Sequence, residues 1–328
     1  MKSFWHMLPR PFFALAPMAD VTDVAFRRLV MHLGKPDVFF TEFVSADGLF
    51  HLREIKKVPD DENPLLRDLM YARGEQPIVA QLFGSNIETM RYAAGVIARL
   101  GFAGVDINMG CPDRSVEKQG AGAALIKNPV RAVELIEAVK DGIKGAGSEI
   151  PVSIKTRIGY DKEIIDEWIP TLLKGKPDAI TVHLRTRKEM SEVSAHWEYM
   201  ERIVKLRDAS GAKTLMIGNG DVHTLEEAKE KVLQSGADGI MVGRAIFGNP
   251  WFFIGRTFDD TPVEERIAAL IMFSRFFEEL SSPKPFHIFK KHIKAFVNGF
   301  PHATELRAKL MNTNSADELI ATLNKWGG

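Results

Sequence analysis

The sequence predicts an α/β fold, a (β/α)8 TIM barrel followed by a C-terminal helical domain. Short apolar runs rich in β-branched residues alternate with helical patterns over roughly 250 residues, the usual length of such a barrel. Most of these runs are continuously apolar, which is typical of parallel strands buried on both faces. The expected strands are residues 12–18, 38–44, 78–83, 105–109, 152–158, 179–184, 214–217 and 239–242.

Capping patterns support helices between these strands. Residues 86–100 are predicted to form a helix that starts after Ser85, with Glu88 completing a capping box. Thr224 opens the helix expected at residues 224–234 in the same way. A doubly wound open sheet is the structural alternative, but its glycine fingerprint, G-x-G-x-x-G, does not occur in the sequence.

The pattern changes to helices alone near residues 258–262. We therefore expect a barrel domain at residues 1–258 and a helical domain at residues 259–328. The helices predicted there are residues 263–280, 286–297, 303–310 and 316–325.

One stretch of the helical domain carries charge of a single sign. No acidic residue lies between Glu279 and Glu305, and Lys290, Lys291 and Lys294 fall within about one helical turn. Such a cluster is often only a solvated helix face. The interleaved aromatic residues favour an RNA-contacting surface as an equal alternative; these residues are Phe286, Phe289 and Phe296.

Composition excludes several classes of protein. The chain has 328 residues, 43 basic and 43 acidic residues and one cysteine. A single cysteine excludes an internal disulfide framework, a cysteine-rich zinc site and a cysteine-ligated iron–sulfur cluster. No uncharged apolar run approaches the ~18 residues of a membrane span. We expect a cytoplasmic monomer without a membrane or metal partner.

Glycine and polar residues gather where the expected strands end, the edge at which such a barrel places its chemistry. Gly218, Gly220 and Gly243 allow backbone amides to approach an anion, and Arg244 adds a fixed positive charge. This pairing after the last two strands favours a phosphorylated ligand. A mononucleotide fits better than a dinucleotide, because no second glycine-rich site occurs.

Three titratable residues stand at the same edge. Lys155 lies in an apolar strand and requires an anion, either a ligand such as a reduced flavin or a carboxylate such as Glu42 or Asp106. Cys111 follows a strand in a Gly-Cys-Pro turn; it is either a small buried thiol or, being protonated at neutral pH, a general acid. A nucleophilic role would need a base, for which His183 is the candidate. His183 is alternatively a ligand contact or structural.

Together these segments resemble the tRNA-dihydrouridine synthase family. The specific part is N-M-G-C-P followed by K-T-R-x-G, and the K-K-H segment resembles the helical tail of the family. The matching segments are A-P-M-A-D-V-T-D (16–23), T-E-F-V-S-A (41–46), Q-L-F-G (81–84), D-I-N-M-G-C-P (106–112), G-A-G-A-A-L (120–125), S-I-K-T-R-I-G (153–159), H-L-R-T-R (183–187), G-N-G-D (218–221) and V-G-R-A-I-F-G-N-P-W (242–251).

The resemblance implies an FMN enzyme that reduces the C5=C6 bond of selected uridines in tRNA, with NADPH as the reductant of the flavin. Hydride passes from flavin N5 to uracil C6, and Cys111 is the implied proton donor to C5. The implied cofactor residues are Pro17, Met18, Ala19, Gln81, Lys155, His183, Asn219, Gly220, Asp221, Gly243 and Arg244. The substrate residues are Asn108, Arg157 and Arg185 near the uracil, with Lys290, Lys291 and Lys294 on the tail and further phosphate contacts expected across Arg185–Arg187.

Two segments depart from the family pattern beside the substrate entrance. Leu184 stands where the family usually has glycine, and we expect it to narrow the space above the flavin. Ser191–Val193 replaces a Tyr-x-Gly-like stretch. Two alternative functions are an FMN-dependent barrel reductase of a small molecule, dihydroorotate-dehydrogenase-like or enoate-type, and a non-catalytic tRNA-binding protein. The first has no need of a basic helical domain, and a bound flavin excludes the second.

Overall fold

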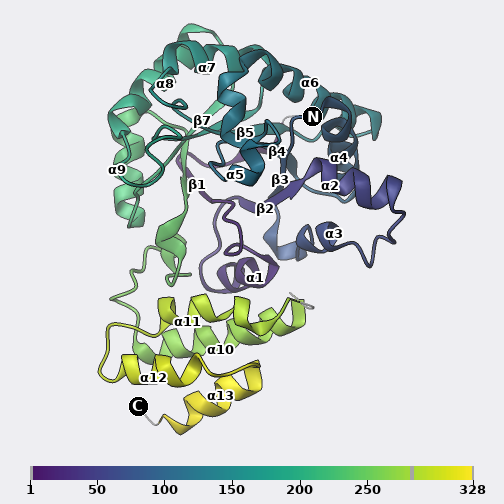
Figure 1. Cartoon of the computed structure of the whole chain (residues 1–328). Coiled ribbons are helices and arrows are strands. Elements are labelled where there is room, and N and C mark those ends of the chain that lie inside the picture. The colour runs from purple at the N-terminus through teal and green to yellow at the C-terminus, as the bar shows by residue number, and fades with distance from the viewer. Residues whose placement is uncertain (1–2, 281–283, 327–328) are drawn as a thin grey trace.

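In the computed structural model, which describes residues 3–280 and 284–326, the predicted runs form parallel strands in one sheet (Figure 1). Each strand pairs with the next along the sheet in the order β1-β8-β7-β6-β5-β4-β3-β2. The strands are β1 Phe12–Leu15, β2 Phe39–Ser45, β3 Ile78–Phe83, β4 Gly104–Met109, β5 Val152–Arg157, β6 Ala179–His183, β7 Leu215–Asn219 and β8 Gly239–Val242.

The sheet closes on itself between β1 and the segment that leads into β2. Ala14 and Val38 form a parallel bridge. The Leu15 amide donates to the Val38 carbonyl at 3.0 Å, and the Asp37 amide donates to the Phe13 carbonyl at 2.9 Å. Closure leaves no free edge, and it confirms the predicted barrel.

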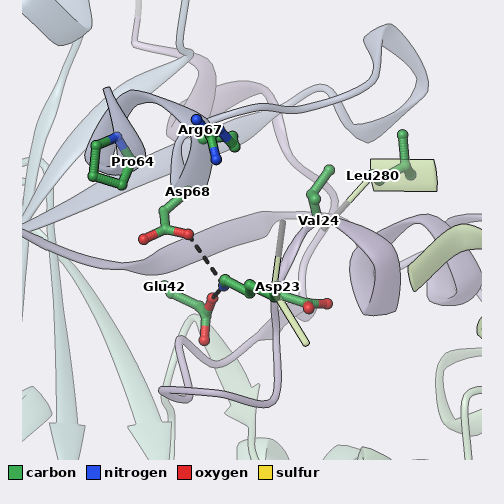
Figure 2. Close-up of a pocket in the computed structure, with 8 residues that line it drawn as sticks. Asp23, Val24, Glu42, Pro64, Arg67, Asp68 and Leu280 are labelled. Carbon is green, nitrogen blue, oxygen red and sulfur yellow. Dashed lines mark ion pairs between the residues drawn. The ribbon is translucent and has the colours of Figure 1, made fainter. Parts of the chain in front are cut away.

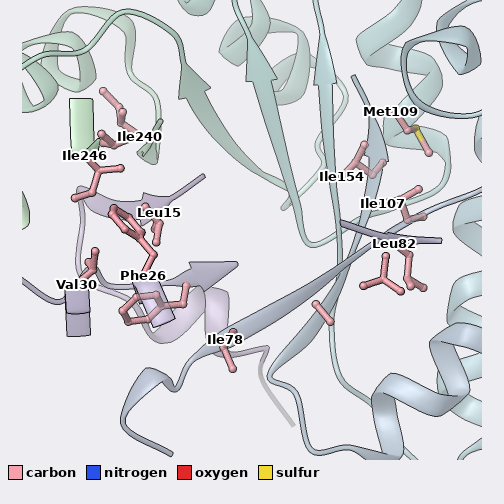
Figure 3. Packing of buried hydrophobic residues seen from close by; sticks show 14 of the residues in the cluster. Leu15, Phe26, Val30, Ile78, Leu82, Ile107, Met109, Ile154, Ile240 and Ile246 are labelled. Atoms are coloured by element: carbon pink, nitrogen blue, oxygen red, sulfur yellow. The ribbon is translucent and has the colours of Figure 1, made fainter. Parts of the chain in front are cut away.

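The strands are apolar throughout because both of their faces are covered. Figure 3 shows side chains of the outer face, such as Leu15, Ile107 and Ile154, packed between the sheet and the surrounding helices. Residues of alternate register, such as Phe12 and Phe40, fill the barrel interior instead. The sequence pattern of continuous apolar runs follows from this double burial.

A tryptophan outside the predicted elements closes the N-terminal end of the barrel. Trp5 lies in a short 3-10 helix, Phe4–Met7, and is fully buried. Its ring centroid is 5.7 Å from that of Phe12 and 6.2 Å from that of Phe40. The barrel interior is therefore a packed core at this end.

The helices around the barrel begin at side-chain caps. Thr224 caps α9 as predicted. The prediction for Ser85 is wrong: Asn86 caps α4, because its side-chain oxygen accepts from the Glu88 and Thr89 amides. The Ser85 hydroxyl donates to the Gln119 carbonyl instead. The helices are α1 Val24–Leu33, α2 Ala46–Phe50, α3 Pro64–Asp68, α4 Ile87–Arg99, α5 Arg114–Glu117, α6 Pro129–Gly145, α7 Ile165–Lys174, α8 Met200–Ala209 and α9 Leu225–Ser235.

The C-terminal region is helical and lies against α1, below the barrel in Figure 1. The Phe26 ring of α1 is 5.5 Å from Phe273 of α10 and 5.8 Å from His292 of α11. The division at residue 258 stays a prediction. Among the described helices, none is both long and apolar enough to cross a membrane. The helices of this region are α10 Val263–Leu280, α11 Lys290–Phe296, α12 Ala303–Leu310 and α13 Ala316–Lys325.

The interleaved aromatic residues do not face solvent. Phe286, Phe289 and Phe296 are buried, and the Phe289 ring lies 4.9 Å from that of Phe273. They form the core that joins α10 to α11, so their expected part in RNA contact is wrong. In this segment His287 and Lys294 are exposed, and Lys290 and Lys291 are half-buried.

Trp5→Ala should lower the free energy of unfolding by about 3–5 kcal/mol, because it leaves a cavity at the closed end of the barrel. Urea unfolding followed by circular dichroism measures the change. Met7→Ala, on the same 3-10 helix but 70% exposed, is the matched control and should change stability by less than about 0.5 kcal/mol. Equal effects of the two substitutions would contradict the role of Trp5.

Candidate functional site

A cavity of about 520 Å³ opens at the C-terminal ends of β1, β5, β6, β7 and β8. We call it the mouth pocket. Of the described residues predicted to bind the cofactor, Ala19 and Gln81 lie outside its lining. The residues predicted for the cofactor that do line it are Pro17, Met18, Lys155, His183, Asn219, Gly220, Asp221, Gly243 and Arg244.

Lys155 brings an unpaired ammonium to the pocket. The side chain projects from β5, and within the described residues its Nζ has no hydrogen bond or ion pair. Burial, followed by the charge of Arg157, lowers the pKa of Lys155 to about 8. The ammonium therefore favours a ligand with negative charge beside it.

The two carboxylates considered as partners of Lys155 are occupied elsewhere. Asp106 accepts from the Ser153 hydroxyl at 2.6 Å and from Gln81 Nε2 at 2.7 Å. Burial raises the pKa of Asp106 to about 6 despite these bonds. Glu42 pairs with Lys284 at 3.7 Å. A ligand thus remains the reason for the lysine.

The hydrogen bonds of Asp106 continue through the interior to Cys111. Gln81 Oε1 accepts from Asn108 Nδ2 at 2.9 Å. Asn108 Oδ1 in turn accepts from the Gly110 amide at 3.1 Å and the Cys111 amide at 2.9 Å. The amides of Gln81 and Asn108, predicted as ligand contacts, therefore fix the turn that carries the thiol.

The loop after Cys111 folds back onto it. The Ala123 amide donates to the Cys111 carbonyl at 2.9 Å. Gly122 permits this return: its φ is 60°, and a Cβ there would lie 2.7 Å from the Cys111 carbonyl oxygen. Any side chain at residue 122 would push the thiol-bearing turn aside.

The Cys111 thiol is half-buried and protonated. Burial raises its pKa above the ordinary value, and the charges of Lys155 and Arg157 oppose this rise without cancelling it. At neutral pH the sulfur carries a proton, as a general acid must. A thiolate nucleophile would require the opposite shift.

His183 is held neutral. Burial, followed by the charges of Lys155 and Arg157, lowers its pKa far below the ordinary value. The Arg185 guanidinium lies 3.1 Å from His183 Nε2, and because arginine can only donate, Nε2 accepts and the ring proton is on Nδ1. This ring offers a ligand a hydrogen-bond donor, and it is not a base for Cys111.

Asp221 bridges two arginines at the end of the pocket where the sequence predicts a phosphate. It pairs with Arg185 and, at 2.7 Å, with Arg244. The Arg185 side chain is only 2% exposed and also donates to the Val193 carbonyl at 2.6 Å. The structure places Arg185 in the pocket wall, where its guanidinium bonds Val193, His183 and Asp221. Its predicted contact with the substrate stays a prediction. Arg244 is 65% exposed and can reach a ligand.

Two further arginines clamp the segments around Cys111. Arg157 donates to the Gly110 carbonyl at 2.8 Å and to the Thr186 carbonyl at 3.1 Å. Arg187 binds the Glu117 carboxylate at 2.5 Å and the Pro112 carbonyl at 3.3 Å. The sequence analysis did not predict a role for Glu117. The one indication in the sequence is that this loop carries an acidic residue while the H-L-R-T-R segment is basic.

The expectation for Leu184 is wrong. Its side chain is fully buried in the core between the sheet and the helices, because it follows His183 on the opposite face of the chain. It does not narrow the mouth pocket. Ser191, from the other departing segment, does line the pocket.

A separate carboxylate cluster lies where the barrel meets the helical region (Figure 2). Lys284 pairs with Asp68 at 3.1 Å and with Glu42 at 3.7 Å. Burial raises the pKa of Glu42 to about 7, an effect that Lys284 opposes and Asp23 adds to. Ion pairs in this cluster link the barrel to the helical region, and the cluster lies apart from the mouth pocket.

Comparison with known proteins matches this chain along nearly its whole length. The family model described as dihydrouridine synthase matches residues 14–326. A protein of Bacillus subtilis (strain 168), "Probable tRNA-dihydrouridine synthase 2", is 42% identical over 98% of this chain and 96% of its own length. "Probable tRNA-dihydrouridine synthase" of Staphylococcus aureus (strain COL) is 40% identical, over 99% of this chain and 96% of its own.

Glu42→Gln should raise the free energy of unfolding relative to the parent protein, and this gain should be larger at pH 8 than at pH 4.5. The folded pKa of about 7 exceeds the unfolded value of 4.5, so the native protein loses stability as pH rises through this window. The difference in unfolding free energy between the variant and the parent should grow by about 3 kcal/mol across it. Denaturant unfolding at several pH values measures this; parallel profiles, or an equal shift in the exposed control Glu230→Gln, would contradict it.

Proposed function

Because the chain belongs to the dihydrouridine synthase family, we propose that it reduces the C5=C6 bond of uridines in tRNA. The observation that carries the proposal is a protonated thiol, Cys111, near an ammonium without a partner, Lys155, at the mouth of the barrel. An acid and an anion-seeking cation are the two groups that reduction of a flat electron-poor ring requires.

The mouth pocket fits flavin mononucleotide. Lys155 would meet the edge of the ring that gains negative charge on reduction, and neutral His183 would donate from Nδ1. Gly220 and Gly243 would admit the phosphate to the backbone, with Arg244 beside it. Gly220 is required there because a Cβ would lie 2.8 Å from that of Ala195. When bound, the reduced flavin supplies the hydride that adds to C6 of the uracil.

The chain itself supplies the proton. Cys111 donates the proton of its thiol to C5 as hydride arrives at C6, which saturates the bond and leaves a thiolate that regains a proton from water. Lys155 and Arg157 lie near enough to lower the pKa of the thiol, so they also stabilise that thiolate. Asn108 and Arg157 both hold the Gly110–Cys111 peptide group, which leads into the residue that carries the sulfur.

The substrate must turn the target base out of the folded tRNA, which costs a few kcal/mol and must be offset by contacts elsewhere. Arg244 and the surface lysines of α11, Lys290, Lys291 and Lys294, are the proposed phosphate contacts. The reductant of the flavin is proposed to be NADPH. The relatives match through the helical region as well as the barrel, which favours a tRNA substrate over a small molecule.

Purified protein should carry FMN and absorb in the flavin bands. Heating should release one mononucleotide per chain, identified by chromatography against FMN and FAD. Lys155→Met should lower the flavin content, because it removes the charge that the ring requires while conserving volume. Recovery of FAD, or of no flavin after reconstitution with FMN, would contradict the cofactor proposal.

Cys111→Ala should retain flavin and tRNA binding and lose most of the turnover, by about 10²–10⁴-fold, because the proton donor is absent. Dihydrouridine formed in unmodified tRNA is measured by mass spectrometry, and flavin reduction by NADPH is followed separately as the control. An unchanged rate of dihydrouridine formation would make Cys111 a structural residue. Absence of dihydrouridine with the parent enzyme, on all host tRNAs, would refute the function itself.

A further inference from the structure

The chain that follows Cys111, residues 112–120, forms a loop at the rim of the barrel. We call it the thiol loop. It begins at Pro112, directly after the residue that carries the sulfur, and it contains the short helix α5, Arg114–Glu117. Because loop and thiol are adjacent in the chain, a shift of the start of this loop displaces the sulfur as well.

Arg187, from the segment after β6, holds the thiol loop at two points. Its Nη2 donates to the Pro112 carbonyl at 3.3 Å. The same guanidinium binds the Glu117 carboxylate, with Nε 3.0 Å from each oxygen and Nη2 2.5 Å from Oε2. One side chain therefore fixes both the first residue of the loop and the last residue of its helix.

The ion pair of Glu117 and Arg187 is largely sheltered from water. The Glu117 side chain is 11% exposed and that of Arg187 is 23% exposed. Burial raises the pKa of Glu117, but hydrogen bonds from Arg187 and Tyr160 outweigh this effect and hold that pKa below its ordinary value. The carboxylate is thus ionised at neutral pH. A charge-assisted pair with several hydrogen bonds restricts geometry more strongly than a single exposed ion pair does.

The two partners of this ion pair belong to different parts of the barrel rim. The backbone of Arg187 is bound to the chain after β5, because its amide donates to the Gly159 carbonyl at 2.9 Å. The next amide, of Lys188, donates to the Tyr160 carbonyl at 2.8 Å. The Arg187 guanidinium also lies 5.5 Å from the centroid of the Tyr160 ring. Arg187 is therefore anchored to the barrel, whereas Glu117 is carried by the loop.

We propose that the ion pair of Glu117 and Arg187 positions Cys111 for proton transfer. The inference rests on the proposed function and adds two positioning residues to it. Asn108 and Arg157 hold the peptide group before the sulfur, and the ion pair holds the chain after it. The sulfur is fixed between the two. A displacement of about 1 Å at a reacting group costs on the order of 100-fold in rate, so the ion pair should matter for turnover.

Glu117→Gln in the flavin-loaded enzyme tests this role, because it removes the charge and keeps the size of the side chain. Its kcat for dihydrouridine formation should fall at least tenfold, while KM for tRNA stays within threefold. A carboxylate does not bind a phosphate, so the loss cannot come from a missing RNA contact. Flavin reduction by NADPH should stay within twofold of the parent, since that step does not use the thiol.

Alkylation by iodoacetamide gives a second readout that needs no RNA. Cys111 is the single cysteine of the chain, so the gain in mass of the intact protein reports on this thiol alone. Glu117→Gln should raise the alkylation rate at least threefold, because a loosened loop exposes the half-buried sulfur. Rates measured from about pH 6 to 10 separate a change of access from a change in the thiol pKa, since only the thiolate reacts.

Asp166→Asn is the matched control. It removes a carboxylate charge from another arginine pair, in which Arg202 Nε donates to Asp166 Oδ1 at 2.8 Å between α7 and α8. Turnover and alkylation of this variant should both stay within twofold of the parent. If either turnover or alkylation of Glu117→Gln falls within twofold of this control, the proposal is overturned.

A double-variant cycle checks that the two residues act as one pair. Arg187→Lys keeps a positive charge but loses the planar fork, so it should also raise alkylation at least threefold. The double variant Glu117→Gln/Arg187→Lys should react no more than twofold faster than the faster single variant. Effects that multiply would show two independent roles and overturn the pairing.

Dihydrouridine formation by the parent enzyme is scored separately from these comparisons. A parent enzyme that forms no dihydrouridine on any host tRNA refutes the proposed function. The alkylation rates then decide alone whether the ion pair fixes the thiol, so the two failures are distinguishable.

Discussion

The ammonium of Lys155 is the constraint on which the site depends. Its burial without a partner lowers the pKa from 10.5 to about 8, which corresponds to about 3 kcal/mol against the charged form. A negative charge 4 Å away would return about 4 kcal/mol at an effective dielectric constant of 20. The Coulomb energy exceeds the cost of keeping Lys155 charged, so the mouth of the barrel favours an anionic ligand. A ring that becomes negative only on reduction would receive this stabilisation selectively in that state.

The surrounding polar groups are arranged so that they do not relieve Lys155 themselves. Asp106 on the neighbouring strand bonds Ser153 and Gln81, and the bonds of Gln81 and Asn108 then run on to the Cys111 turn. One buried network thus engages the carboxylate in hydrogen bonds, so that its charge acts on Lys155 without a direct ion pair, and the same network fixes the turn that carries the sulfur. The raised pKa of Cys111 results from the same geometry, because burial outweighs the nearby cations. The donor stays protonated although positive charge surrounds it.

The strands were predictable because burial on both faces imposes a continuous apolar run. Their ends were predictable because a barrel of this kind places its polar residues where the strands end. Single side chains were less predictable. Whether Leu184 faces the pocket or the outer core depends on a register that alternates at every residue. Trp5 lies outside every periodic segment, and only the closed barrel shows why an aromatic ring is needed there. Glu117 and Arg187 meet across 70 residues of sequence, a pairing that no local pattern encodes.

The helical region matters because it brings charge to a fixed place on a protein whose net charge is zero. Arg27 of α1 is held by a fully buried ion pair with Glu75, at 2.6 Å, so α1 is a rigid base for what packs on it. Phe26 then contacts α10 and α11 through Phe273 and His292, and Lys284 is bound by Asp68 and Glu42. The ring contacts of Phe26 and the ion pairs of Lys284 therefore set where α11 lies relative to β8. The positive charge that a nucleic acid or a dinucleotide needs arises from this placement, since the composition of the chain does not provide it.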